Sequence, residues 1–146
     1  IRNVKVEYSS KKKHSFELNY INDKFNLIDL SENKKITALN NSRASRYYSY
    51  FSDIRYEDII ERKSLKDSLQ TVEHFCKITV RDKNDQVVDL RAYRKLSTGK
   101  EDEFGQTSRY DLNHLYGVFS EYEEILLIKY TEIDPLFKEI DYFRVD

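Results

Sequence analysis

Apolar and polar side chains alternate along several short segments of this chain, and this pattern constrains the fold more than any other feature. Successive side chains of a β-strand point to opposite faces, so alternation predicts strands with one buried face and one wetter face. Such strands are typical of antiparallel sheets, because strands in a parallel sheet are usually apolar on both faces. The alternating segments are residues 1–8, 14–20, 25–30, 74–80 and 86–96.

The stretch from Asn40 to Ile60 contains the best candidate for a helix in the core. Its apolar residues recur at i, i+3, i+4 and i+7, which gathers them into one stripe, and they are Ala44, Tyr47, Tyr48 and Phe51. Asn40 or Asn41 is suited to cap the start of the helix, since a short amide accepts a hydrogen bond from the first turn. Large aromatic side chains can bury about 150–250 Å² each. We therefore expect this helix to fill the core, with Phe51 at its centre.

A second segment repeats this spacing 68 residues further along the chain, with Leu112, Leu115, Tyr116 and Phe119. It also repeats the string Tyr-x-x-Phe-Ser-acid, which occurs at residues 48–53 and 116–121. The pattern predicts a second amphipathic helix over 112–119, and an internal duplication would explain it. The halves would then be 1–62 and 70–131, followed by a tail over 132–146. The alternative is that two unrelated amphipathic helices share the same spacing.

Together these patterns predict an α+β fold in one domain spanning 1–146. The expected architecture is a mainly antiparallel sheet with both amphipathic helices on one face, built from a possible duplicated hairpin-helix-strand unit. The length suits a single domain. Near the end, Asp134 followed by Pro135 at a first helical position indicates one more short helix.

Composition excludes several classes of protein. Charged residues make up 35% of the chain but balance to a formal net charge of −1, which argues against a dedicated binder of nucleic acid or of anionic membranes. The longest apolar run, Ile125–Ile128, is far shorter than the roughly 20 residues of a membrane-spanning helix. We therefore expect no nucleic-acid partner and no membrane insertion by this segment. The single Cys76 cannot form an internal disulfide.

No recognisable reactive constellation is present in the sequence. The histidines, at positions 14, 74 and 114, lack partners at metal-ligand spacing, and the glycines match no phosphate-binding fingerprint. Cys76 and His74 share a strand face in the predicted register, yet a Cys beside Ile78 and Val80 is typical of a buried core residue. We therefore expect no catalytic residue, no metal and no cofactor.

Three residues of the segment 86–96 form the candidate binding surface. Arg91, Tyr93 and Lys95 are two apart, so they share one face of a strand. The opposite set, Leu90, Ala92 and Leu96, is more apolar and is expected to face the helices. An exposed Tyr between two cations would suit a protein or glycan partner, and the loop from Ser97 to Arg109 would border it. The alternative is an ordinary solvated sheet face.

Several strings, taken in order, resemble an uncharacterised family of gut-bacterial proteins in which a soluble domain follows an N-terminal membrane anchor. The strings are Ser15-Phe16, the Tyr50-Phe51 region, Asp67-Ser68, Tyr110-Asp111-Leu112-Asn113 with Tyr116, Ile128-Lys129-Tyr130, Asp134-Pro135-Leu136 and Asp141-Tyr142-Phe143. The resemblance implies a periplasmic or cell-envelope protein whose anchor is missing here, and the absence of Met agrees with a trimmed chain. It carries over no catalytic residue.

Two functions remain open at this point. The first is a non-catalytic interaction or scaffold domain of an anchored envelope protein, with another protein or a glycan as its partner. The second is a small ligand-binding or hydrolytic domain with a carboxylate and Tyr site, for example for glycans. The residues themselves also leave a cytoplasmic location open.

Overall fold

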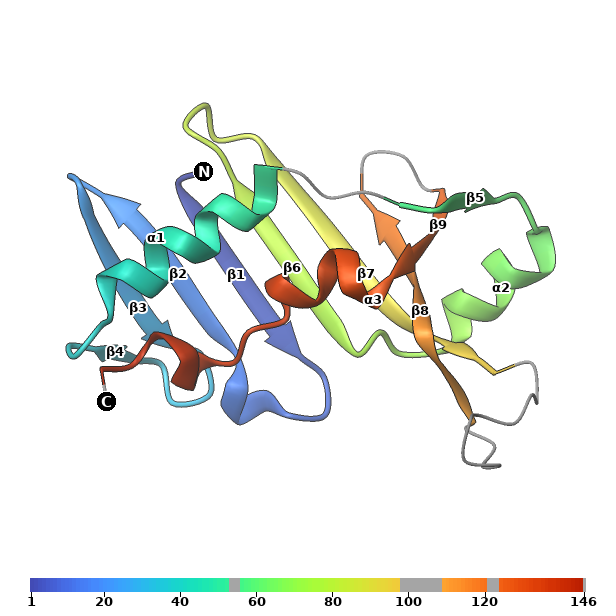
Figure 1. Cartoon of the computed structure of the whole chain (residues 1–146), viewed down its shortest axis with the longest axis horizontal. Coiled ribbons are helices and arrows are strands. Elements are labelled where there is room, and N and C mark those ends of the chain that lie inside the picture. The colour runs from blue at the N-terminus through green and yellow to red at the C-terminus, as the bar shows by residue number, and fades with distance from the viewer. Residues whose placement is uncertain (53–55, 98–108, 121–123, 146) are drawn as a thin grey trace.

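A computed structural model describes residues 1–52, 56–97, 109–120 and 124–145 of the chain. These residues form a nine-stranded, fully antiparallel sheet with helices packed against it (Figure 1). The strand order is β4-β3-β2-β1-β6-β7-β8-β9-β5. The predicted α+β class and antiparallel sheet are confirmed.

The strands are β1 (Asn3–Tyr8), β2 (Phe16–Ile21), β3 (Lys24–Asp29), β4 (Lys34–Ile36), β5 (Asp58–Ile60), β6 (Cys76–Arg81), β7 (Val87–Leu96), β8 (Tyr110–Phe119) and β9 (Ile125–Lys129). The α-helices are α1 (Asn41–Ser49), α2 (Lys63–Thr71) and α3 (Tyr130–Ile133). Short 3₁₀ turns occupy 12–14, 50–52, 134–136 and 140–143. None of the helices in the described part of the chain is long and apolar enough to cross a bilayer.

Two four-stranded meanders meet at the centre of the sheet. Strands β1 to β4 form one meander and β6 to β9 the other, and they join through antiparallel pairing of β1 with β6, where Val4 lies opposite Val80. A helix follows each meander, α1 after β4 and α3 after β9. Each meander is thus followed by a helix, whereas the predicted repeat unit was hairpin-helix-strand.

One face of the sheet carries the main core. In Figure 1, α1 and the C-terminal segment from α3 onward lie across this face. The ring of Phe143 lies 4.7 Å from that of Phe16 and 5.2 Å from that of Tyr47, between centroids, and all three residues are fully buried. The Tyr47 hydroxyl donates a hydrogen bond of 2.7 Å to the Leu136 carbonyl. This aromatic cluster fixes α1 and the C-terminal segment to the sheet.

Helix α1 begins as predicted, because the Asn40 side chain accepts a hydrogen bond of 3.1 Å from the Arg43 amide. Of the predicted apolar stripe, Ala44 and Tyr47 are fully buried. Phe51, however, is only half-buried at the end of the helix, with its ring 5.3 Å from that of Tyr47. The prediction that Phe51 is the centre of the core is wrong, and Tyr47 holds that position.

The prediction of a helix over 112–119 is also wrong, since these residues belong to strand β8. Leu115 faces the main core, whereas His114 and Tyr116 point to the other face, so the segment also satisfies a period of two. Gly117 leaves room in β8 for a side chain of the neighbouring strand β9. A Cβ atom there would lie 2.7 Å from Ile128 Cδ1, so Gly117 permits close contact between neighbouring strands. The proposed alignment of 44–51 with 112–119 therefore pairs a helix with a strand.

Helix α2 packs on the opposite face of the sheet. Its buried residue Leu69 contacts Tyr93 and Ile125 in a small second cluster, whereas the strand neighbours Ala92 and Leu126 belong to the main core. Because adjacent side chains on a strand point to opposite faces, α2 and α1 cover different faces. The two helices expected on one face were those at 44–51 and 112–119; the first is α1, the second is strand β8, and the helix that shares the main-core face with α1 is α3.

Candidate functional site

The predicted binding residues Arg91, Tyr93 and Lys95 do not form one open patch. Leu90 and Ala92 are buried in the main core as predicted, so Tyr93 points to the second face. There α2 covers it and leaves the Tyr93 side chain only 6% exposed. The predicted exposure of Tyr93 is wrong because α2 packs over this end of the sheet.

The other members of the predicted set also have separate surroundings. Arg91 is half-buried and lines a hollow of about 570 Å³ beside α2, together with Lys77 and Asp89. Lys95 forms an ion pair of 3.3 Å with Asp111. Leu96, expected to face the helices, is 63% exposed, because the register of β7 and β8 shifts between residues 94 and 96. The predicted border loop lies outside the described residues from 98 to 108.

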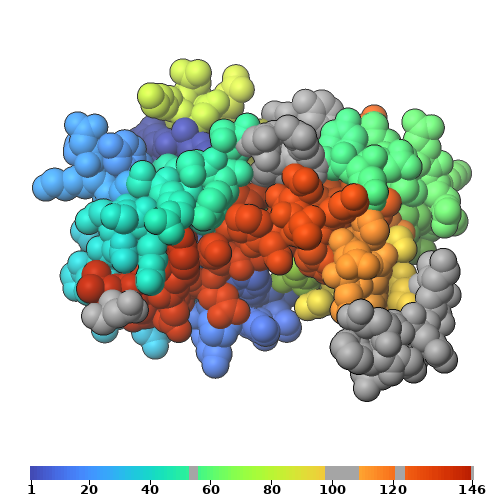
Figure 2. Space-filling view, in the orientation of Figure 1, coloured from blue at the N-terminus to red at the C-terminus, as the bar shows by residue number. Residues whose placement is uncertain are grey.

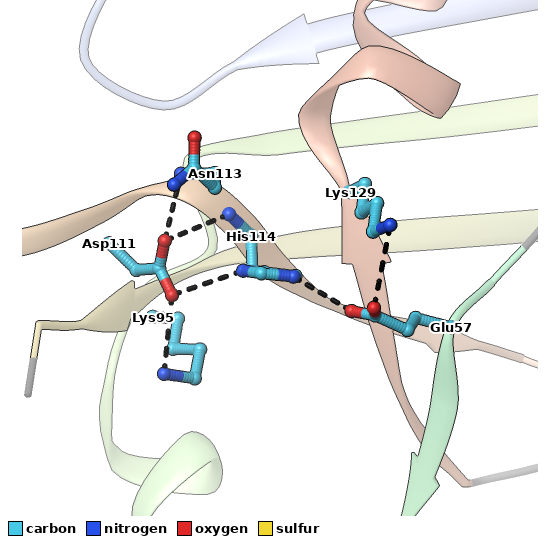
Figure 3. Close-up of polar contacts among 6 residues, drawn as sticks. All are labelled: Glu57, Lys95, Asp111, Asn113, His114 and Lys129. Atoms are coloured by element: carbon cyan, nitrogen blue, oxygen red, sulfur yellow. Dashed lines mark hydrogen bonds and ion pairs between the residues drawn. The ribbon is translucent and has the colours of Figure 1, made fainter.

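A polar network joins β8 to its neighbours (Figure 3). His114 Nε2 lies 2.7 Å from the Glu57 carboxylate, and His114 Nδ1 lies 3.2 Å from that of Asp111. Lys95 and Lys129 complete the network, at 3.3 Å from Asp111 and 3.5 Å from Glu57. Each carboxylate therefore has a cationic neighbour, and His114 connects the two.

Asp111 is held in its charged form. Burial alone would raise the pKa of Asp111. Hydrogen bonds from the backbone of Asn113, the Lys95 ammonium and the backbone of His114 lower this pKa by a larger amount, so the net pKa lies below the usual value. A general acid at neutral pH requires a raised carboxyl pKa, which Asp111 lacks. The network is therefore suited to tying β7, β8 and the segment before β5 together.

Replacing Asp111 by Asn should reduce the pH dependence of stability. A carboxyl whose folded-state pKa is depressed stabilises the fold above its unfolded pKa, and this contribution is lost as the pH falls through the folded pKa. We expect wild type to lose more unfolding free energy than Asp111→Asn between about pH 6 and about pH 3, measured by urea denaturation. Asp29, whose pKa is also lowered, chiefly by its hydrogen bond from Ser31, contributes equally in both proteins. Identical losses in the two proteins would contradict the role of Asp111.

A concave site with a largely apolar lining lies between α2 and the ends of β7 and β8, and we call it the α2 pocket. It encloses about 560 Å³, within the range of small-ligand pockets. It is lined by Leu65, Ser68, Leu69 and Val72 of α2 and its end, by Glu73, His74 and Phe75, by Tyr93, Arg94, Leu96, Arg109, Tyr110 and Tyr116, and by Ser9 and Ser10. Apolar and aromatic side chains form most of this lining.

Two arginines stand at the rim of the α2 pocket on aromatic rings. The Arg94 guanidinium lies 4.9 Å from the Phe75 ring centroid and 5.6 Å from that of Tyr110. The Arg109 guanidinium lies 5.5 Å from the Tyr110 centroid. Among the described residues, no carboxylate forms an ion pair with either arginine. Stacking holds the planar guanidinium while its N–H groups stay available to a planar acceptor.

The other ionisable groups near the α2 pocket add little positive charge. Burial and the nearby Arg91 and Lys77 lower the pKa of His74, which favours neutral imidazole at pH 7. Glu73, which is exposed, supplies the one carboxylate among the described lining residues. The pocket rim thus has two arginines against one glutamate.

Cys76 is not poised for nucleophilic chemistry. It is fully buried in the main core, and burial raises the pKa of its thiol to about 12, so the reactive thiolate is scarce at neutral pH. Within the described residues, no group of three or more His, Cys, Asp or Glu side chains is placed to hold a metal ion.

Sequence reasoning missed most of the α2 pocket. A signal was present, since Leu65, Leu69 and Val72 recur at i, i+4 and i+7 on one helix face. The sequence could not reveal that this face would lie over Tyr93 and Tyr116, because that contact joins distant parts of the chain. No family model, curated protein or solved structure matches the chain.

Proposed function

We propose that this chain is a non-catalytic interaction domain and that the α2 pocket is where it holds its partner. The observation that carries the proposal is the combination of an apolar, aromatic-lined hollow with two arginines at its rim that pair with no described carboxylate. Tyr and Arg are enriched where proteins bind one another.

The setting of the proposal is a cell-envelope protein with an anchor outside this chain. Its support is the resemblance of strings such as Asp134-Pro135-Leu136 and Asp141-Tyr142-Phe143 to the anchored gut-bacterial family. A domain held at the envelope can use a small, specific pocket, because anchoring keeps its partner at high effective concentration. Another envelope protein is the partner we expect.

Filling the α2 pocket should abolish capture of the partner without harming the fold. Ser68 is exposed on α2 and lines the pocket, so Ser68→Trp places a large ring in the hollow. Asp67→Trp is the matched control, since Asp67 is the preceding exposed residue and lines neither hollow beside α2. Immobilised wild type, Ser68→Trp and Asp67→Trp would each be incubated with an envelope extract from a gut bacterium.

We expect one protein to be retained by wild type and by Asp67→Trp and to be lost with Ser68→Trp. Thermal melting followed by circular dichroism should give similar midpoints for all three proteins. Retention of the same protein by Ser68→Trp, with its fold intact, would refute the α2 pocket as the site of interaction.

A further inference from the structure

The rim of the α2 pocket and its walls favour different parts of one ligand. The walls are apolar at Leu65, Leu69 and Val72 and aromatic at Tyr93 and Tyr116. The rim carries Arg94 and Arg109, whose guanidinium groups lie 4.9 Å from the Phe75 ring centroid and 5.5 Å from that of Tyr110. A ligand that satisfies both parts has an apolar body and an anionic end.

The geometry points to a carboxylate as that anionic end. Arg presents its N–H groups in a planar fork that matches a carboxylate, often through two parallel hydrogen bonds. The centroid of the Tyr110 ring lies 5.6 Å from the Arg94 guanidinium and 5.5 Å from that of Arg109. Both cations thus adjoin the same ring of the pocket lining, and the carboxylate would lie beside that ring.

From this arrangement we infer that the α2 pocket binds the carboxyl-terminal residue of a partner chain that ends in a large apolar side chain. The side chain would enter the pocket beside Leu65, Val72 and Tyr116, and the terminal carboxylate would pair with Arg94 and Arg109. Recognition of a chain terminus by fixed donors is an established way of reading short peptides. The inference rests on the proposed function and adds the chemical class of the partner's contact.

A glycan fits this lining less well. Sugars expose many hydroxyl groups, and each one that is buried needs a hydrogen-bond partner. The α2 side of the lining offers Leu65, Leu69 and Val72, with hydroxyl groups only from Ser68 there and from Ser9 and Ser10 elsewhere, beside the lining tyrosines. A uronic acid could still use the two arginines, so it belongs among the ligands that are compared.

The test is an NMR titration of the ¹⁵N-labelled chain with ligands that differ at one group. The probes are N-acetylphenylalanine, its carboxamide, a hexapeptide ending in Phe as the free acid or the amide, and glucuronic acid. For a ligand of this size we expect the free acid to bind with a Kd of roughly 0.1–1 mM. Each amide should bind about tenfold more weakly, because it lacks the charge that strengthens hydrogen bonds to Arg.

Variants of the rim arginines show whether the carboxylate sits where we place it. Arg94→Gln and Arg109→Gln should each weaken binding of the acids by about tenfold and leave binding of the amides nearly unchanged. Arg46→Gln is the matched control, since Arg46 is exposed on α1 and far from the pocket residues in the sequence. It should bind the acids as wild type does, and thermal melting would establish that all variants fold.

Several results would overturn the inference. They are equal affinity for acid and amide, unchanged affinity in both Arg94→Gln and Arg109→Gln, tightest binding of glucuronic acid, and no saturable shift with any acid up to about 10 mM, well above the Kd expected for this size.

The relative affinities of the two acids identify the source of the ligand. Tighter binding of the hexapeptide than of N-acetylphenylalanine would place the ligand on a partner chain, and the reverse order would favour a free small acid and contradict that source. Capture blocked by Ser68→Trp but unaffected by Arg94→Gln would preserve the proposed function and refute this inference. Arginine-dependent binding of the acids without any captured protein would preserve the ligand class and refute the proposed function.

Discussion

Phe143→Ala should lower the free energy of unfolding by about 3–5 kcal/mol, the usual cost of deleting a fully buried Phe. Phe143 is 0% exposed and packs against the rings of Phe16 and Tyr47. Its carbonyl also accepts a hydrogen bond of 2.7 Å from the Asn40 amide, next to the start of α1. The substitution would leave a cavity where the C-terminal segment meets α1, and few nearby side chains could move to fill it.

Phe51→Ala is the matched comparison, because it removes the same side chain from the margin of the same aromatic cluster. Phe51 is half-buried and contacts Tyr47 from one side, so we expect a loss of about 1–2 kcal/mol from its smaller buried area. Urea denaturation of both variants would provide the two values. A larger loss for Phe51→Ala than for Phe143→Ala would mean that the centre of the core has been placed incorrectly.

The first helix could be predicted because every local signal agreed with its place in the fold. The Asn40 cap, the stripe beginning at Ala44 and the strands on either side all favour the same element. Most of the alternating segments are strands for the same reason, as in β1, β2 and β6. Where local preference and long-range packing agree, the secondary structure of a segment can be predicted from its sequence.

Strand β8 shows where prediction from local pattern fails, because a helix was predicted over residues 112–119. Leu112, Leu115, Tyr116 and Phe119 satisfy helical spacing, but Leu115 and Phe119 also share a strand face, as any residues an even number apart do. Pairing with β7 and β9 on both sides decided between the two periods. That pairing joins distant residues, and the composition of the segment alone does not encode it.

The candidate site was predicted only in part for a related reason. The sequence correctly placed Arg91 and Tyr93 away from the main core, but it did not foresee that α2 would cover Tyr93. The predicted surface was therefore replaced by two hollows, one on each flank of α2, with Tyr93 bordering both. A pocket formed by packing between elements cannot be read from the residues of one strand.

Helix α2 should depend strongly on a single side chain. It has nine residues, its one buried residue is Leu69, and Arg62 at its start provides no side-chain cap. Helices this short are marginal in water unless tertiary contacts hold them. The contacts of Leu69 with Tyr93 and Ile125 provide that support.

Leu69→Ala should therefore release α2 and remove the α2 pocket together with its ligand binding. We expect an overall loss of about 2–3 kcal/mol, toward the lower end of the range for Leu→Ala because the cluster is small. The larger effect should be local, with amide protons of α2 losing protection from hydrogen exchange while those of β1 and β6 keep it. Asp67→Ala, an exposed change on the same helix, should alter stability by no more than about 0.5 kcal/mol and leave exchange unchanged. If Leu69→Ala kept α2 protected and still bound N-acetylphenylalanine, then Leu69 would not be the contact that builds the site.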